Sequence, residues 1–316
     1  MRLSDAQQTR TLAGSAISPV LILGPWRSGS TVMHELLTAA TGLPTPRTWQ
    51  CMSPATFQLS RTPPATAIIA RPMDGLSIDA QSPQEDEFAL LAMGVDSAYR
   101  AFWQAGRIGE MVYTLDPAFW LQERKWLAPW ESFLRGVLRS APGSDGTVIL
   151  KSPNHTYRLP AIAQHFMQLR MVWMARPAAQ VFLSNRKMWN AMFALHSLPD
   201  SKASDMALDQ FLAQALDRAA QVLEWCLEVL PRTQWAVVQQ SDLHDVPELV
   251  TAALCRRLQL PMATEPIALE DALARVSQGR VDQYGWQVLP GTALAACHRL
   301  DEVQAIAMHR CGINKE

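Results

Sequence analysis

The stretch that most constrains the fold of this chain is VLILGPWRSGSTVMHELL, residues 20–37. Its first four residues form an apolar run, which predicts a buried parallel strand. A turn bearing Gly24 and Gly29 follows, and the apolar residues after that turn recur at helical spacing. A strand, a glycine turn and a helix N-terminus together aim free backbone N–H groups at one point. This arrangement suits the binding of a phosphate or a similar anion.

The turn can be compared with the nucleotide-hydrolase loop G-x-x-x-x-G-K-[ST]. Gly24, Gly29 and Thr31 occupy the two glycine positions and the final hydroxyl position, but Ser30 stands where the lysine belongs, and Arg27 lies inside the loop. The lysine of such a loop reaches the outer phosphates of a triphosphate, and the hydroxyl holds magnesium. Without the lysine, ATP hydrolysis is a poor fit. Taken alone, the stretch is also compatible with a plain tight turn.

The bulk properties describe an ordinary globular protein of 316 residues, 48% hydrophobic and 18% charged, with a net charge of −1. Near-neutral charge gives no reason to expect a nucleic-acid partner, so any anion site must be local. Five scattered cysteines without a C-x-x-C pair indicate reduced thiols, a cytoplasmic location and no zinc cluster. We find no signal-peptide core and no run of about 18 apolar residues, so we expect no membrane span. A homodimer is left open.

Further strands and helices alternate along the chain. Apolar runs predict three more strands, and helical periodicity predicts helices between and after them. This alternation predicts an α/β fold with a mostly parallel sheet that helices cover on both faces. The predicted strands are TVILK (147–151), RMVWMARP (170–177) and QWAVVQQSDL (234–243), and the predicted helices include 157–167, 178–189, 208–230 and 247–260.

Three of the predicted strands are followed by loops that carry polar residues, at 24–31, 151–155 and 176–184. Ligands of parallel sheets bind at the carboxyl ends of the strands, so these loops are expected to line one site. Arg176 at a strand exit and Ser184 in the next helix can hold two faces of one phosphate group. Lys151, the last residue of its strand, would add a positive charge beside the first loop.

These three segments resemble the sulfotransferases that use 3′-phosphoadenosine 5′-phosphosulfate (PAPS). GPWRSGST is similar to the 5′-phosphosulfate loop of that family, RPAAQVFLS to its 3′-phosphate motif, and LKSPNHTYRLPAI to the K-x-P strand end of its bacterial branch. The resemblance covers roughly residues 18–290. It implies a P-loop-like sulfotransferase fold, in which a single α/β domain is built on about five parallel strands. We expect one domain over 1–316, with 1–17 as an N-terminal extension.

The resemblance also implies roles for individual residues. The loop residues Arg27, Ser28, Gly29, Ser30, Thr31 and Val32 would hold the 5′-phosphosulfate without a metal. Lys151, with Arg27, would neutralise the oxygen that gains charge as the S–O bond breaks. Arg176 and Ser184 would grip the 3′-phosphate. Gly279 and Arg280 stand where the family returns a basic loop over that phosphate, although the R-K-G triplet of the cytosolic branch is missing, and Arg280 could equally be a solvated surface arginine.

A base must take the proton of the acceptor hydroxyl. The cytosolic branch places a histidine two residues after its strand-end lysine, and here that position is Pro153. His155 is expected to bond backbone at a helix start, and His34 could approach the sulfur or simply pack beneath the loop.

The segment SPQEDEF, residues 82–88, offers carboxylates as an alternative base. Its pattern predicts a helix capped by Ser82, with Glu85 as the capping-box partner. Tyrosyl-protein and related sulfotransferases use a glutamate base, so we expect Glu87 first and Glu85 second to serve here. Stabilisation of a helix N-terminus by acidic side chains is the competing explanation for the cluster.

The acceptor is not legible in the sequence. Eleven tryptophans and fourteen methionines could line an adaptable apolar pocket or simply form core. We expect transfer of a sulfuryl group to a hydroxyl or amine of a small molecule, lipid or natural product. A small-molecule kinase with a P-loop and an inactive nucleotide-binding protein of the same fold are the alternatives.

Overall fold

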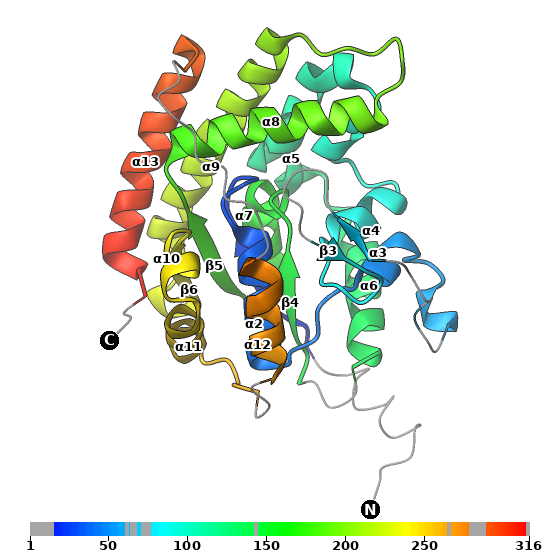
Figure 1. Ribbon diagram of the computed structural model, residues 1–316, viewed down its shortest axis with the longest axis vertical. Helices are drawn as coiled ribbons and strands as arrows, with labels where there is room; N and C mark the ends of the chain where they lie inside the picture. Colours follow the sequence, from blue (N-terminus) through cyan, green and yellow to red (C-terminus); the bar gives the residue numbers. More distant parts are fainter. Residues whose placement is uncertain are drawn as a thin grey trace, which may run out of the picture.

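The computed structural model of the chain describes residues 16–60, 63, 68–70, 77–141, 145–263, 267–277 and 289–313. A four-stranded sheet lies at its centre (Figure 1), and all of its strand pairs are parallel. The strands are β1 (Ser18–Leu23), β4 (Thr147–Lys151), β5 (Arg170–Ala175) and β6 (Trp235–Gln239), in the spatial order β4-β1-β5-β6. The predicted parallel α/β fold is confirmed, with four strands in this sheet of the described residues where the resemblance implies about five.

Helices cover both faces of the sheet because the strands are apolar on both sides. Val20 and Ile22 of β1 pack into a cluster with α2, α11 and α12, whereas Leu21 and Leu23 pack into a larger cluster on the opposite face. Figure 1 shows α2 and α12 in front of the sheet and α7 and α9 behind it. The helices that build these layers are α2 (Ser30–Thr41), α6 (Leu127–Arg139), α7 (His155–His165), α8 (Ala178–His196), α9 (Asp205–Val229), α11 (Pro247–Leu258), α12 (Ile267–Ser277) and α13 (Gly291–Cys311).

Shorter elements fill the region between α2 and β4. A two-stranded antiparallel ribbon pairs β2 (Ile69–Ala70) with β3 (Ser77–Ile78). The tryptophan-rich part of this region is packed as core, with the side chains of Trp120 and Trp130 almost fully buried. The remaining short helices are α3 (Thr48–Met52), η1 (Phe57–Leu59), α4 (Glu87–Ala92), η2 (Ala98–Phe102), η3 (Ala105–Leu115), α5 (Pro117–Gln122), η4 (Arg232–Gln234) and α10 (Asp242–Asp245).

The helix start predicted at Ser82 is wrong, because α4 begins at Glu87. The preceding residues pair instead with the start of α3. Arg47 and Pro83 form a bridge, and the Thr48 N–H donates to the Ser82 carbonyl. Ser82 donates its hydroxyl to Asp79 rather than capping a helix. Glu85 is therefore not held in a capping box and its side chain is available for tertiary contacts.

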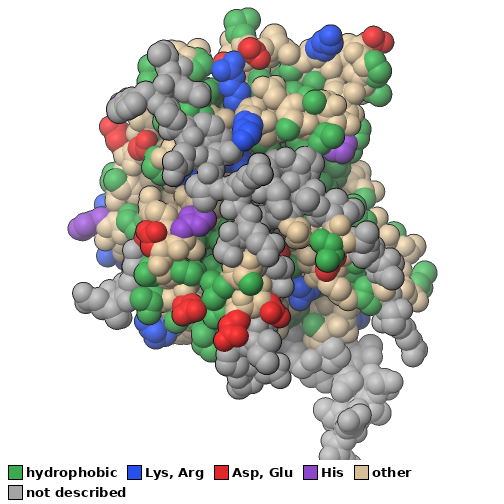
Figure 2. All heavy atoms as spheres, viewed as in Figure 1, with side chains coloured by type: hydrophobic (Ala, Val, Ile, Leu, Met, Phe, Trp, Pro, Cys, Tyr) green, Lys and Arg blue, Asp and Glu red, His purple; other side chains and the backbone are tan. Residues whose placement is uncertain are grey.

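The charge of the surface is mixed, as the net charge of −1 suggests. Figure 2 shows acidic and basic side chains interspersed over the described part of one face. No helix among the described residues combines the length and the apolar character that crossing a bilayer requires.

The turn from β1 into α2 requires glycine at Gly24. Its φ is 132°, and a Cβ placed there would lie 2.9 Å from the carbonyl oxygen of Met174 on the neighbouring strand. Thr156 of α7 fixes the same residue, because its hydroxyl accepts from the Gly24 N–H at 3.0 Å and donates to the Gly24 carbonyl at 3.1 Å. The chain therefore leaves β1 in one defined direction.

We expect Gly24→Ala to lower the free energy of unfolding by about 1–3 kcal/mol, since the substitution adds backbone strain and a steric clash. Urea unfolding measures this change. Gly109→Ala is the matched control, because a Cβ at Gly109 would meet nothing within 4 Å; we expect it to stay within about 0.5 kcal/mol of the wild type. Equal effects of the two substitutions would contradict the close approach at Gly24.

Candidate active site

The three predicted loops meet at the carboxyl edge of the sheet. β1 lies between β4 and β5, so the loops that follow these strands are neighbours in space. The chain passes from β1 to β4 on one side and later to β5 on the other, and such a switch point is where parallel sheets bind ligands.

The first wall of the site is the loop 24–29 and the start of α2. Gly29 takes φ 94° at the N-cap of this helix, which has no side-chain cap. The first N–H groups of a helix have no intrahelical acceptor, and the helix dipole adds positive potential there. Ser28 in the loop is fully buried, and its hydroxyl makes no hydrogen bond with the described residues. Ser30, Thr31 and Val32 form the first turn of α2, so the predicted loop residues all lie at this N-terminus.

Arg27, Arg176 and Ser184 lie together. The Arg176 guanidinium donates through Nη1 to the Arg27 carbonyl oxygen at 2.8 Å, and Arg27 donates through Nε to the Ser184 hydroxyl oxygen at 3.1 Å. Arg27 adopts φ 66°, a conformation that non-glycine residues rarely take and that is often found at functional sites. Two arginines, one from the exit of β1 and one from the exit of β5, are thus joined to a hydroxyl of α8.

Trp26 anchors the loop in the core beneath these arginines. Its side chain is 2% exposed and lies among Tyr157, Trp189 and Phe211, with ring centroids 5.6–6.1 Å away. Asn185 of α8 donates to the Trp26 carbonyl at 2.7 Å. The position of Arg27 is therefore set by a buried aromatic ring on one side and by α8 on the other.

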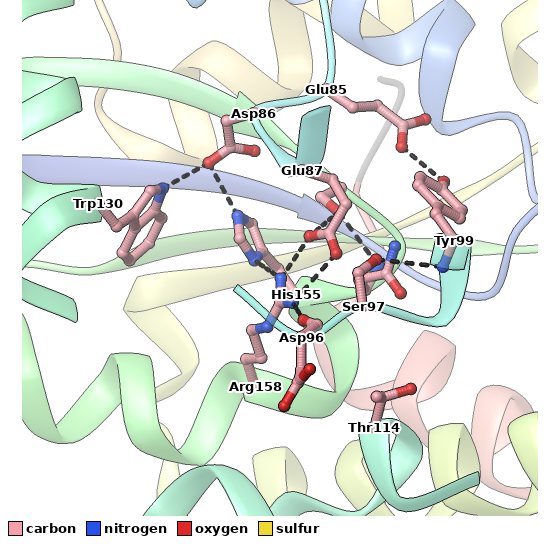
Figure 3. A network of polar contacts seen from close by, with 12 residues as sticks. Glu85, Asp86, Glu87, Asp96, Ser97, Tyr99, Thr114, Trp130, His155 and Arg158 are labelled. Atoms are coloured by element: carbon pink, nitrogen blue, oxygen red, sulfur yellow. Dashed lines mark hydrogen bonds and ion pairs between the residues drawn. The ribbon is translucent and has the colours of Figure 1, made fainter. Parts of the chain in front are cut away.

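Lys151 reaches the site from the end of β4 and pairs with Glu85. The Nζ atom lies 2.5 Å from Glu85 Oε1 and 3.4 Å from Thr31 Oγ1. The other carboxylate oxygen of Glu85 accepts from the Tyr99 hydroxyl at 2.7 Å (Figure 3), and that hydroxyl oxygen accepts from Trp26 Nε1 at 3.1 Å. These contacts form a ring of hydrogen bonds that starts at Thr31 and ends at Trp26, both on the first wall of the site.

Tyr99 acts in this ring as a permanent donor to Glu85. Burial raises the pKa of Tyr99 well above its usual range, and the nearby carboxylate of Glu85 raises it further. The hydroxyl consequently stays protonated at neutral pH. Tyr99 also stacks on Phe102, with ring centroids 4.8 Å apart, which orients the hydroxyl.

Glu87 is sealed in the interior. Its side chain and that of Arg158 are both 0% exposed, and Arg158 binds both carboxylate oxygens, with Nη2 3.0 Å from Oε1 and Nη1 against Oε2. The guanidinium also donates to the Asp96 carbonyl at 2.8 Å and lies 4.3 Å from the ring centre of Trp120. Glu87, expected first from the sequence, is thus enclosed by Arg158, whereas Glu85 is 9% exposed and reaches Lys151.

Asp86 is buried between the two glutamates and is held by different partners. His155 Nε2 lies 2.9 Å from Asp86 Oδ2, and Trp130 donates to the same oxygen at 2.6 Å (Figure 3). His155 therefore bonds a carboxylate rather than the backbone. Because Asp86 and Glu87 are both anchored inside, Glu85 is the acidic residue of the three that meets the lysine.

His34 lies beneath the first turn of α2, with Nε2 2.6 Å from Thr45 Oγ1, and is 1% exposed. Burial lowers the pKa of His34 well below its usual value, and the positive charges of Lys151 and Arg47 lower it further. The imidazole is therefore neutral at pH 7. Gly279 and Arg280 lie outside the described residues. No group of three or more histidine, cysteine and acidic side chains placed to hold a metal occurs in the described part of the chain.

Several residues that shape the site were not singled out from the sequence. Tyr99 and Trp26 belong to aromatic-rich stretches that look like core. Arg158 lies five residues after Pro153, the proline of the K-x-P strand end. Thr156 is a hydroxyl in the first turn of α7, directly after the loop that follows β4. Only the contacts of these side chains reveal what they do.

With this geometry in place, the comparison with known proteins is decisive for the family. The model of the sulfotransferase family matches residues 19–264. The chain belongs to that family. Among curated proteins it is 27% identical over 237 residues to the omega-hydroxy-beta-dihydromenaquinone-9 sulfotransferase Stf3 of Mycobacterium bovis, and equally to that of Mycobacterium tuberculosis. These matches cover 73% of the chain and 60% of the relatives' length.

Solved structures of the sulfotransferase family share the fold. Sulfotransferase STF9 from Mycobacterium avium superposes with a TM-score of 0.66 over 98% of this chain and 80% of its own, at 16% identity. Sulfotransferase STF1 from Mycobacterium tuberculosis gives a TM-score of 0.61 over 94% of this chain and 80% of its own, also at 16% identity. The arrangement of sheet and helices is therefore that of bacterial sulfotransferases.

We expect Arg158→Met to lower the free energy of unfolding by about 3–5 kcal/mol, because Glu87 would be left as a buried charge without its partner. Urea unfolding followed by circular dichroism measures the loss. Arg135→Met is the control, since Arg135 pairs with Glu131 at a partly exposed position and such pairs contribute about 0–1 kcal/mol. A loss at Arg158 no larger than that at Arg135 would show that the buried pair is unimportant for stability.

We expect acid to destabilise the protein through His34. The unfolded chain binds a proton on this imidazole near pH 6.5, whereas the folded state resists it because the pKa is lowered. As the pH falls below 6.5, the unfolded state therefore takes up more protons and the free energy of unfolding drops, by at most about 1.4 kcal/mol per pH unit. His34→Gln should remove this component between pH 7.5 and pH 5.5. The exposed His309 gives the control variant, His309→Gln, and an unchanged pH slope in His34→Gln would contradict the assignment.

Proposed function

We propose that this protein transfers a sulfuryl group from PAPS to the hydroxyl of a small-molecule acceptor. The observation that carries the proposal is the meeting of Arg27, Arg176 and Ser184 beside Lys151, at the exits of three neighbouring strands. Two anion-binding positions on adjacent strand ends suit a nucleotide with phosphate groups on both sides of its ribose. Membership of the sulfotransferase family supports the same reaction class.

The donor would be held from both ends. The N–H groups at the start of α2, with the hydroxyls of Ser30 and Thr31, would bind the 5′-phosphosulfate, where the helix dipole favours negative charge. Arg176 and Ser184 would bind the 3′-phosphate, which ATP lacks. Ser30 at the usual lysine position fits a donor that carries fewer phosphates than ATP at its 5′ end.

The base in this proposal is Glu85. The acceptor oxygen attacks sulfur, the bond from sulfur to the 5′-phosphate oxygen breaks, and the acceptor proton passes to Glu85. Lys151 donates a hydrogen bond to the departing phosphate oxygen, which gains negative charge. In the structure Lys151 pairs with Glu85, so a donor that draws the lysine toward its bridging oxygen would release one carboxylate oxygen for the acceptor. Tyr99 keeps the other oxygen in place.

The names of the relatives support an apolar, hydroxylated acceptor. The curated relatives are named as omega-hydroxy-beta-dihydromenaquinone-9 sulfotransferases. We extend to this chain only the hydroxyl and the apolar character of such an acceptor. The chain spans 60% of the length of these relatives, so their full activity is not carried over.

The test is sulfate transfer from radiolabelled PAPS to a panel of hydroxylated quinones, phenols and aliphatic alcohols. We expect transfer by the wild type, a loss of turnover of about 10²–10⁴-fold in Glu85→Gln because the base is removed, and nearly unchanged binding of adenosine 3′,5′-bisphosphate by that variant. Arg176→Ala should weaken bisphosphate binding roughly tenfold to hundredfold, since charge-assisted hydrogen bonds are lost. Calorimetric titration measures the binding.

Glu110→Gln, at an exposed position, is the control for the change of charge and should match the wild type in both assays. Stabilisation by ATP and magnesium but not by the bisphosphate would favour a kinase. Bisphosphate binding without transfer to any acceptor or to water would indicate a nucleotide-binding protein that does not turn over. Full turnover in Glu85→Gln would assign the base to another group.

A further inference from the structure

The C-terminal helix α13 contacts the turn that carries Arg176. The side-chain amide of Gln304 makes a reciprocal pair of hydrogen bonds with the Arg176 main chain: its Oε1 accepts from the Arg176 N–H at 3.3 Å, and its Nε2 donates to the Arg176 carbonyl at 3.1 Å. Gln304 is 7% exposed. Both backbone groups of the residue that follows β5 are thus satisfied by one side chain from a distant part of the sequence.

The same helix caps α8. Pro177 precedes α8 and offers no side-chain cap, and the N–H of Ala178 instead donates to Asp301 Oδ1 at 2.8 Å. Gln304 Nε2 lies 3.3 Å from the same carboxylate oxygen. Asp301 and Gln304 therefore hold three consecutive residues, 176–178, as one connected unit.

The helix α13 is itself fixed in place. Figure 1 shows it running along α9, and Arg299 binds Asp217 and Glu224 of that helix, each at 2.7 Å. Its inner face packs into the main core, and Gly312 at its end forms a bridge with Val237 of β6. Because α13 is fixed, it can hold the turn at residues 176–178 in one position.

The turn at residues 176–178 sets the direction of the Arg176 side chain. From the fixed backbone, the guanidinium donates through Nε to Gln180 at 3.3 Å and through Nη1 to the Arg27 carbonyl. Arg176 is 7% exposed, so its side chain is closely surrounded and its backbone position sets how far the guanidinium reaches. The residues matched by the family model end at 264, so the contacts that hold Arg176 from behind come from outside that match.

We propose that Gln304 and Asp301 are positioning residues that set the preference of this enzyme for a nucleotide bearing a 3′-phosphate. The inference rests on the function proposed above, because it assigns the 3′-phosphate to Arg176. Gln304 and Asp301 touch no donor themselves. They act through the main chain of residues 176–178, which fixes the reach of the arginine and the start of α8, the helix that carries Ser184.

The alternative is that these contacts only fasten α13 to the rest of the fold. A merely structural role would weaken all nucleotide binding equally, or change only the stability. A positioning role would weaken the binding of a nucleotide that has the 3′-phosphate and leave a nucleotide without it unaffected. The comparison of two ligands on one variant therefore separates the two roles.

The experiment is calorimetric titration of the full-length protein with adenosine 3′,5′-bisphosphate and with adenosine 5′-monophosphate. We expect Gln304→Leu to weaken the bisphosphate roughly tenfold, as the loss of two hydrogen bonds at a nearly buried site implies, and to leave the monophosphate unchanged. Glu302→Gln, at an exposed position of α13, is the matched control and should bind both ligands as the wild type does.

A second pair of variants tests the inference without Gln304, should Gln304→Leu fail to fold. Asp301→Asn keeps an oxygen acceptor for the Ala178 N–H and should retain the preference for the bisphosphate, whereas Asp301→Ala should lose most of it. Equal weakening of both ligands in Gln304→Leu or Asp301→Ala, or no weakening, overturns the positioning role while the proposed function stands. A wild type that binds the two ligands equally overturns the donor assignment and this inference together.

Discussion

The hydrogen bond from the Arg176 guanidinium to the Arg27 carbonyl is the contact on which the site depends. It joins the exit of β5 to the exit of β1 at Arg27, whose left-handed backbone is rare outside glycine. The surroundings determine this conformation from several sides, through Trp26 in the core and Asn185 on α8. In the proposed function, a strained loop held in this way would need little reorganisation when the donor binds.

The acidic segment before α4 shows how burial divides three similar residues into different roles. Asp86 and Glu87 are both 0% exposed; His155 and Trp130 bind one oxygen of Asp86, and Arg158 binds both oxygens of Glu87. Buried charges of this kind seldom add net stability, but each is costly to separate from its partner. Their value here is geometric, because two fixed carboxylates leave Glu85 directed at Lys151 and Tyr99. The ring of hydrogen bonds then returns through Trp26 to the loop that would hold the donor.

The sequence predicted the site where local pattern and chemistry agree. The strands before Gly24, Lys151 and Arg176 were recognised from their apolar runs, and parallel strands necessarily bring their carboxyl ends to one edge. The start of α4 and the partners of the glutamates were not predictable in the same way. A capping pattern at Ser82 is weaker than pairing with the segment beside Arg47. Which of Glu85 and Glu87 is enclosed depends on which one Arg158 reaches, which is a contact across 71 positions of sequence.

By itself the sequence determined the order of strands and helices, the glycine turn after β1 and the residue types in it, because these follow from periodicity and from the conformational freedom of glycine over a few neighbouring residues. Only the tertiary structure decided which carboxylate meets the lysine, that Tyr99 and Trp26 complete the ring, and that Gln304 and Asp301 hold the turn of Arg176. Apart from the bond between Tyr99 and Glu85, these contacts join residues 66 to 128 positions apart. Their formation depends on how the helices pack over the sheet, and packing is a property of the whole chain rather than of any one stretch.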